Sequence, residues 1–158
     1  MVDATTARPI PGAFVIAVTR SAGADMFGSR SSCRDLDVVQ ADSNGRYRLS
    51  VGRSMGNDSQ TVMGYAPGYM DGEDDKQFLK LKPFKGTGND RVESFARYGS
   101  LVRCGGTDVT APKLRALFAA IDVEGATLPL SRFGYPVNFS EGLRRLEQLS
   151  RREALQKQ

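Results

Sequence analysis

The side chains that most often carry chemistry in proteins are sparse in this sequence. It contains no histidine among its 158 residues, which removes the usual general base at neutral pH and the histidine partner of serine and cysteine nucleophiles. Zinc and copper sites that require histidine are excluded on the same ground. The sequence therefore predicts a protein that is not an enzyme and that holds neither a metal nor a cofactor. A hydrolase that uses carboxylates alone, for instance on glycans, remains an alternative.

The two cysteines, Cys33 and Cys104, lie far apart and match no Cys-x-x-Cys pattern. The sequence therefore supports neither a zinc site nor a thioredoxin-type motif. One interpretation is a long-range disulfide in an oxidising compartment, which would close a loop of about 70 residues and contribute about 4 kcal/mol in the chain-entropy account. The other is a pair of buried free thiols in a cytosolic protein.

An acidic run, Asp71-Gly72-Glu73-Asp74-Asp75, could hold a hard cation such as calcium through its carboxylates. Its spacing is not that of an EF-hand loop, so we expect a solvated acidic loop. Aromatic residues near the expected strand ends could anchor a protein partner, although packing inside the fold is their commoner role. The candidate partner-binding residues are Tyr69, Asp71, Glu73, Asp74, Phe133 and Tyr135.

Basic residues crowd the end of the chain, which has a net charge of +4. Such a segment can attract nucleic acid or anionic surfaces by counterion release. Glu141, Glu147 and Glu153 interleave these cations, however, and this mixture favours a solvated helix face. We therefore expect another protein as the partner, and no nucleic acid. The basic residues are Arg144, Arg145, Arg151, Arg152 and Lys157.

The first half of the chain has the pattern of strands and turns. The segment 13–19 is apolar and rich in β-formers, which predicts a strand buried on both faces. Residues 21–32 are rich in Gly and Ser and are expected to form a loop. The other predicted strands are 33–41, 46–51, 61–66 and 78–82.

The best turn signal is Asp42-Ser43-Asn44-Gly45, because Asn-Gly adopts the positive φ values of a tight hairpin. It predicts that Val38 and Val39 lie on a strand paired with Tyr47 and Leu49.

The pattern changes to helical spacing after Pro83. We expect one helix from Asp90, which serves as its cap, to about Arg103, and a second after Thr110. A third is expected from Ser140. Strands followed by helices predict an α+β protein with domains 1–83 and 84–158.

Three motifs in the first half carry a family resemblance. The opening Val2-Asp3-Ala4-Thr5-Thr6-Ala7-Arg8-Pro9-Ile10-Pro11-Gly12-Ala13-Phe14-Val15 resembles that of carboxypeptidase regulatory-like domains, roughly V-x-D-x-x-T-G-x-P-(I/L)-x-G-A-x-V. The segment from Asp42 to Tyr47 is similar to their T-D-x-x-G-x-(Y/F) hairpin, with Ala41 in the place of the threonine. Tyr65-Ala66-Pro67-Gly68-Tyr69 is similar to their closing A-x-G-Y element. The resemblance covers about half the chain.

The resemblance implies a seven-stranded transthyretin-like (prealbumin-like) Greek-key β-sandwich over residues 1–83. About three helices would then follow, packed on or beside it. It also implies a non-catalytic, protein-binding role in the bacterial cell envelope, and it favours the disulfide. A subtype of that role is an immunity or inhibitor protein for a secreted effector; an accessory domain of a peptidase or glycan-processing system is the alternative.

The resemblance further implies a periplasmic or secreted location. No run of about 18 apolar residues could span a membrane. The first strand looks cut short at Met1, so we expect a leader to precede this segment.

Overall fold

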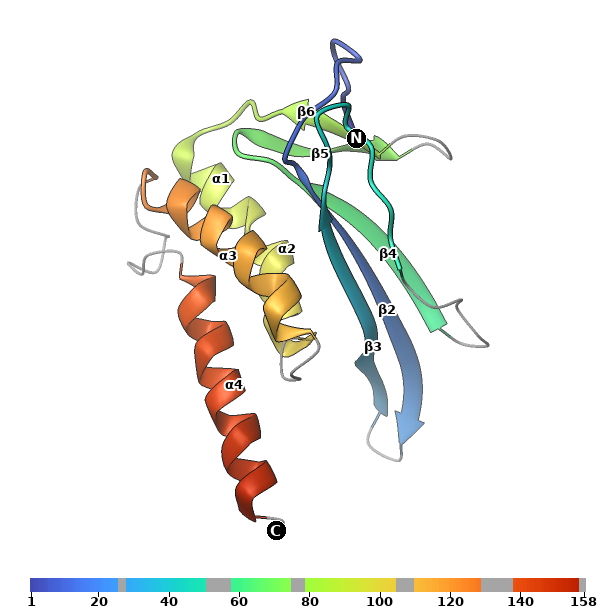
Figure 1. The fold of residues 1–158 in the computed structure, drawn as a ribbon, viewed down its shortest axis with the longest axis vertical. Helices are drawn as coiled ribbons and strands as arrows, with labels where there is room; N and C mark the ends of the chain where they lie inside the picture. The colour runs from blue at the N-terminus through green and yellow to red at the C-terminus, as the bar shows by residue number, and fades with distance from the viewer. Residues whose placement is uncertain (26–27, 51–57, 75–78, 105–109, 129–137, 157–158) are drawn as a thin grey trace. The chain divides into compact units, whose positions relative to one another are not determined.

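The computed structural model describes residues 1–25, 28–50, 58–74, 79–104, 110–128 and 138–156. The chain divides into two compact units, Met1–Pro83 and Phe84–Gln158 (Figure 1). The first contains strands and the second contains helices, which confirms the α+β class.

Within its described residues, the first unit has six strands in two three-stranded sheets. One sheet has the order β3-β2-β4 and is antiparallel. The other has the order β1-β6-β5, in which β1 is parallel to β6. The seven-stranded Greek-key sandwich stays a prediction. The strands are β1 (Val2–Asp3), β2 (Phe14–Asp25), β3 (Gly28–Gln40), β4 (Asp58–Tyr65), β5 (Tyr69–Asp74) and β6 (Leu79–Pro83).

The expected loop at 21–32 is wrong over its described residues 21–25 and 28–32, because β2 and β3 continue to pair there (Figure 1). Backbone pairing extends from Phe14 opposite Gln40 to Asp25 opposite Gly28. Gly and Ser disfavour strands only weakly, and a continuous antiparallel partner overrides that preference.

The predicted strand at 46–51 is also wrong over its described residues 46–50, although the turn before it is present. The N–H of Gly45 donates to the carbonyl of Asp42, and Gly45 has a φ of +72°. The Asp42 carboxylate accepts hydrogen bonds from two further backbone N–H groups in this turn. Val38 and Val39 pair with β2 and not with residues 46–50. The segment 46–50 is instead attached to β3 by a hydrogen bond that the N–H of Ser50 donates to the Asp37 carboxylate at 2.6 Å.

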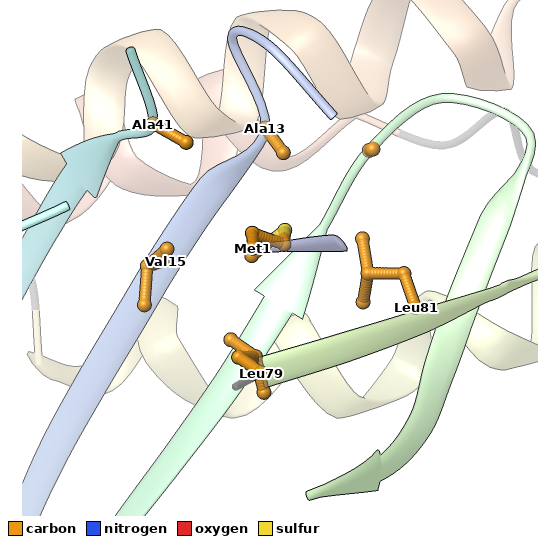
Figure 2. Packing of buried hydrophobic residues seen from close by; sticks show 7 residues of the cluster. Met1, Ala13, Val15, Ala41, Leu79 and Leu81 are labelled. Atoms are coloured by element: carbon orange, nitrogen blue, oxygen red, sulfur yellow. The ribbon is translucent and has the colours of Figure 1, made fainter. Parts of the chain in front are cut away.

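A compact apolar cluster lies between the two sheets of the first unit (Figure 2). Val15 of β2 and Ala13, which precedes the strand, lie on the face toward Leu79 and Leu81 of β6. Phe14, Ile16 and Val18 on the other face of β2 are buried as well, as the sequence predicts for segment 13–19. The cluster consists of Met1, Ala13, Val15, Ala41, Ala66, Leu79 and Leu81.

In the second unit, the expected helix from 90 to 103 is broken into three short pieces. Its cap is Thr87 and not Asp90: the Thr87 hydroxyl accepts from the N–H of Asp90, whose carboxylate accepts from the N–H of Thr87. The second and third predicted helices are present. The helices are α1 (Gly88–Ser94), α2 (Ala96–Gly99), the 3-10 helix η1 (Ser100–Cys104), α3 (Ala111–Gly125) and α4 (Phe139–Gln156).

A substitution at Gly64 of β4 tests how closely the two sheets pack. A Cβ at this position would lie 2.9 Å from the Leu81 Cδ2 atom and 2.9 Å from the Met1 Cε atom. We expect Gly64→Ala to lower the free energy of unfolding by about 1–3 kcal/mol, measured by urea denaturation. The control is Gly142→Ala in α4, whose Cβ would meet Val102 Cγ1 at an ordinary 3.6 Å. This control should gain up to about 1 kcal/mol. Equal midpoints for Gly64→Ala and the unaltered chain would contradict the close packing.

Candidate functional site

Both cysteines are disulfide-bonded and neither is free. Because the chain has two cysteines, the bond joins Cys33 of β3 to Cys104 of η1. This agrees with the predicted disulfide between the two cysteines.

A β-bulge determines which way Cys33 points. Thr19 pairs with Asp35 but the next residue, Arg20, pairs with Cys33, so Arg34 is the extra residue. Cys33 and Leu36 are three residues apart and would lie on opposite faces of a regular strand. The bulge shifts the alternation by one residue and brings both to the same face.

Arg34 itself lies on the other face of this sheet. Its guanidinium pairs with the Asp58 carboxylate at 2.5 Å, and Asp58 lies opposite Ser21 in the ladder. The hydroxyls of Ser21 and Ser32 also meet on that face, at 2.8 Å. The Cys33 sulfur and the Arg34 guanidinium therefore lie on opposite faces of this sheet.

Two of the candidate partner-binding residues hold the strand unit together. The half-buried Tyr69 hydroxyl donates to the Asp3 carboxylate, which raises the pKa of Tyr69. Asp3 also accepts the N–H groups of Thr5 and Thr6 at 2.7 and 2.9 Å. The Asp71 carboxylate accepts the N–H of Gly64 at 3.1 Å. These contacts give both residues a role inside the fold.

The side chains of the other four candidates, Glu73, Asp74, Phe133 and Tyr135, lie outside the described part of the chain. Asp71–Asp74 belongs to strand β5, so the expectation of an acidic loop is wrong there. The backbones of Glu73 and Asp74 are placed in β5, while their side chains lie outside the described part. Phe133 and Tyr135 also lie outside the described residues. Among the residues that are described, no group of three or more acidic or cysteine side chains could hold a metal ion.

A buried ion pair fixes α1 against α3 in the helical unit. Arg91, only 3% exposed, donates to both carboxylate oxygens of Glu124, at 2.7 and 2.9 Å. Its guanidinium also lies over the rings of Phe84 and Phe95, 5.3 and 4.9 Å from their centroids. The charge is therefore paired bidentately and sheltered by aromatic rings.

The end of α3 also sets the start of α4. The two carboxylate oxygens of Asp122 accept the N–H groups of Phe139 and Ser140, at 2.7 and 2.9 Å. Asn138 accepts the N–H of Glu141 at 3.0 Å and completes the cap. The ring of Phe139 packs on Phe118 of α3, with centroids 5.5 Å apart. One end of α3 thus positions both α1 and α4.

This arrangement leaves a hollow of about 250 Å³ between α3 and α4. Its apolar member, Leu143, is only 2% exposed, and charged side chains surround it. The lining residues are Arg115 of α3 and Ser140, Leu143, Arg144 and Glu147 of α4.

In the ion pairs around the hollow, the arginine side chain is more exposed than the glutamate it pairs with. Arg115 pairs with Glu147 at 2.7 Å, with side-chain exposures of 58% and 18%. Arg144 and Arg145 both pair with Glu141; they are 60% and 73% exposed, against 31% for the carboxylate. Hydrogen bonds from Arg144, and then from Arg145, lower the pKa of Glu141 to about 2. Glu141 is therefore ionised at neutral pH. Both carboxylates are partly covered, and the guanidinium groups of Arg115, Arg144 and Arg145 are more exposed.

The sequence pattern finds only part of this site. The spacing of Glu141 to Arg144 and Arg145 is a recognisable helical pairing signal. Arg115 and Glu147 are far apart in the chain, and only the packing of α3 on α4 brings them together. No signal in the sequence identifies the hollow.

No known protein-family model, curated protein or solved structure matches the chain. In the described part of the chain, no helix combines the length and apolar character needed to cross a bilayer.

Moving the cysteine from position 33 to position 34 tests which face of β3 carries the disulfide. In Cys33→Ser/Arg34→Cys the thiol is displaced to the opposite face of β3, so we expect no bond to Cys104 and two free thiols by titration without reductant. Deletion of Arg34 is the control, because Cys33 then still lies opposite Arg20 and the disulfide should form. Quantitative disulfide in the double variant would contradict the placement of Cys33 and Arg34 on opposite faces of β3.

Removing one partner of the buried ion pair should be costly. We expect Glu124→Leu to lower the free energy of unfolding by about 3–5 kcal/mol, because Arg91 is left charged and buried. The double variant Arg91→Met/Glu124→Leu should recover most of that loss in urea denaturation. A loss in the double variant equal to or larger than that in the single variant would show that the ion pair is not the cause.

Proposed function

We propose that this protein is a non-catalytic, protein-binding module of an oxidising compartment such as the bacterial periplasm or the extracellular space. The observation that carries the proposal is the hollow between α3 and α4, with its exposed guanidinium groups. Arginine is among the residues enriched in protein-binding hot spots.

The engaged state of the carboxylates supports binding over hydrolysis by carboxylates alone. Asp37, Asp122 and Glu124 accept hydrogen bonds from the backbone or from arginine. A pair of carboxylates acting on a glycan needs one acid with a raised pKa. In the described part of the chain, the shifts resolved for Asp and Glu side chains are all downward.

The disulfide supports the location, because structural disulfides persist in oxidising compartments. A narrower form of the proposal is an inhibitor or immunity protein for a secreted effector. Small size and the absence of histidine suit such a role. The carboxypeptidase regulatory-like resemblance suits it too, as it does an accessory domain in a peptidase or glycan-processing system.

Site-directed photocrosslinking tests the proposal. A benzophenone amino acid at Ala119, exposed one turn along α3 from Arg115, is irradiated in envelope extract. We expect one discrete adduct whose second protein is identified by mass spectrometry. The control position is the exposed Thr5 of the strand unit, which should give no such adduct. No adduct at micromolar protein, or the same adducts from both positions, would contradict binding through this surface.

A further inference from the structure

Strand β4 is an outer strand of the β3-β2-β4 sheet, so one row of its backbone groups points away from β2 (Figure 1). The N–H of Gly64 belongs to this row, because it donates to the Asp71 carboxylate. Pairing of β4 with β2 is continuous, so every second residue from Gly64 has the same orientation. Val62, Gln60 and Asp58 therefore also direct their N–H and C=O groups outward.

The middle of this outward row is open. At one end, the Gly64 N–H is taken by Asp71 at 3.1 Å. Within the described part of the chain, the outward N–H and C=O groups of Gln60 and Val62 have no hydrogen-bond partner. The side chains of residues 59–61 are exposed. These backbone groups are therefore accessible to the strand of another molecule.

The opposite edge of the sheet, formed by β3, is protected. The bulge at Arg34 interrupts its pairing pattern, and the N–H of Leu36 donates to the Asp35 carboxylate at 2.8 Å. Farther along, the N–H of Ser50 donates to the Asp37 carboxylate. Bulges and charged side chains are the usual means by which an edge strand avoids pairing with another chain. The β4 edge has no bulge in its pairing with β2, so it is the edge that can pair.

The open row of β4 is complementary to a second copy of itself. In an antiparallel pair of β4 strands related by a two-fold axis, Gln60 can lie opposite Val62 of the second copy. Every open N–H then donates to an open C=O. Thr61 lies on the axis opposite its own copy, and cross-strand threonine pairs are favourable. The next outward pair would place Asp58 opposite Gly64, whose N–H is already taken, so the ladder ends there.

The charges along β4 are compatible with this self-pairing. Residues 59–63 contain no charged side chain, and the Asp58 carboxylate is neutralised by Arg34 at 2.5 Å. Two copies can therefore approach along β4 without like charges facing each other.

We infer that the protein self-associates through antiparallel pairing of β4 in two copies, with Thr61 on the two-fold axis. The paired surface belongs to the strand unit, and the inference does not rest on the α3–α4 hollow.

Cysteine trapping tests the register of this pair. Directly opposite residues of the non-hydrogen-bonded kind have Cα atoms about 4.5 Å apart, which is within disulfide range. Thr61→Cys should therefore form a covalent dimer under mild oxidation, seen by non-reducing electrophoresis and assigned by peptide mapping. The control is Ser59→Cys, which is exposed on the same strand. Its two introduced sulfurs would lie about 13 Å apart along the strand, so at least about tenfold less covalent dimer is expected.

Sedimentation equilibrium of the full chain tests the association itself, and we expect a reversible monomer–dimer equilibrium. Thr61→Lys places like charges opposite each other and should weaken the dimer at least about fivefold, as should Thr61→Glu. An equimolar mixture of the two variants should recover the affinity, because opposite charges then face each other. The control Thr5→Lys adds the same charge at an exposed position of the strand unit and should change the affinity less than about twofold. Unaltered circular dichroism identifies variants that remain folded.

Several results would overturn the inference. They are a chain that stays monomeric up to about 100 μM, equal covalent dimer from Thr61→Cys and Ser59→Cys, or no gain in affinity when the Thr61→Lys and Thr61→Glu variants are mixed. A monomeric chain whose position 61 crosslinks to a different protein in envelope extract would assign this edge to that protein and would equally overturn the self-pairing.

Discussion

The Cys33–Cys104 disulfide is the constraint on which the rest of the structure depends. The chain forms two compact units of roughly 80 residues each, and domains of this size bury a modest share of their surface on folding. Closing a loop of about 70 residues removes unfolded-state entropy worth about 4 kcal/mol. The register of β3 places Cys33 opposite Arg20, and the bulge at Arg34 keeps it on the same face as Leu36. The facing of this edge strand therefore determines where the cysteine sulfur lies.

In the helical unit, carboxylate side chains hold the helices together. In the strand unit, an apolar cluster between the two sheets does so. Glu124 and Asp122, two residues apart near the end of α3, hold Arg91 of α1 and the first N–H groups of α4. Neither carboxylate needs a catalytic role to explain its position. Their joint effect is to fix α4 beside α3, so that Leu143 and Arg144 share a hollow with Arg115. The hollow is therefore a consequence of two structural carboxylates.

Sequence reasoning finds what local chemistry determines. Apolar residues around Val15, the Asn44-Gly45 turn and the stripes of α3 and α4 all identify elements that the structure contains. It fails where pairing decides the outcome. Residues 21–32 are strand because β2 and β3 continue to pair, and the acidic β5 is strand because β6 pairs with it. The bulge at Arg34 follows from the register of β3 against β2. The Arg115–Glu147 contact follows from the packing of α3 on α4. Neither can be predicted from the residues next to it in the sequence.

The central claim is one oxidised chain in which Cys33 is disulfide-bonded to Cys104. Peptide mapping of the native protein by mass spectrometry, after alkylation without reductant, tests it directly. The account predicts one crosslinked pair of peptides containing Cys33 and Cys104, which separates on reduction, and no alkylated cysteine. Alkylation of both cysteines in protein taken from an oxidising compartment, or a crosslink between two copies of the same cysteine peptide, would contradict it.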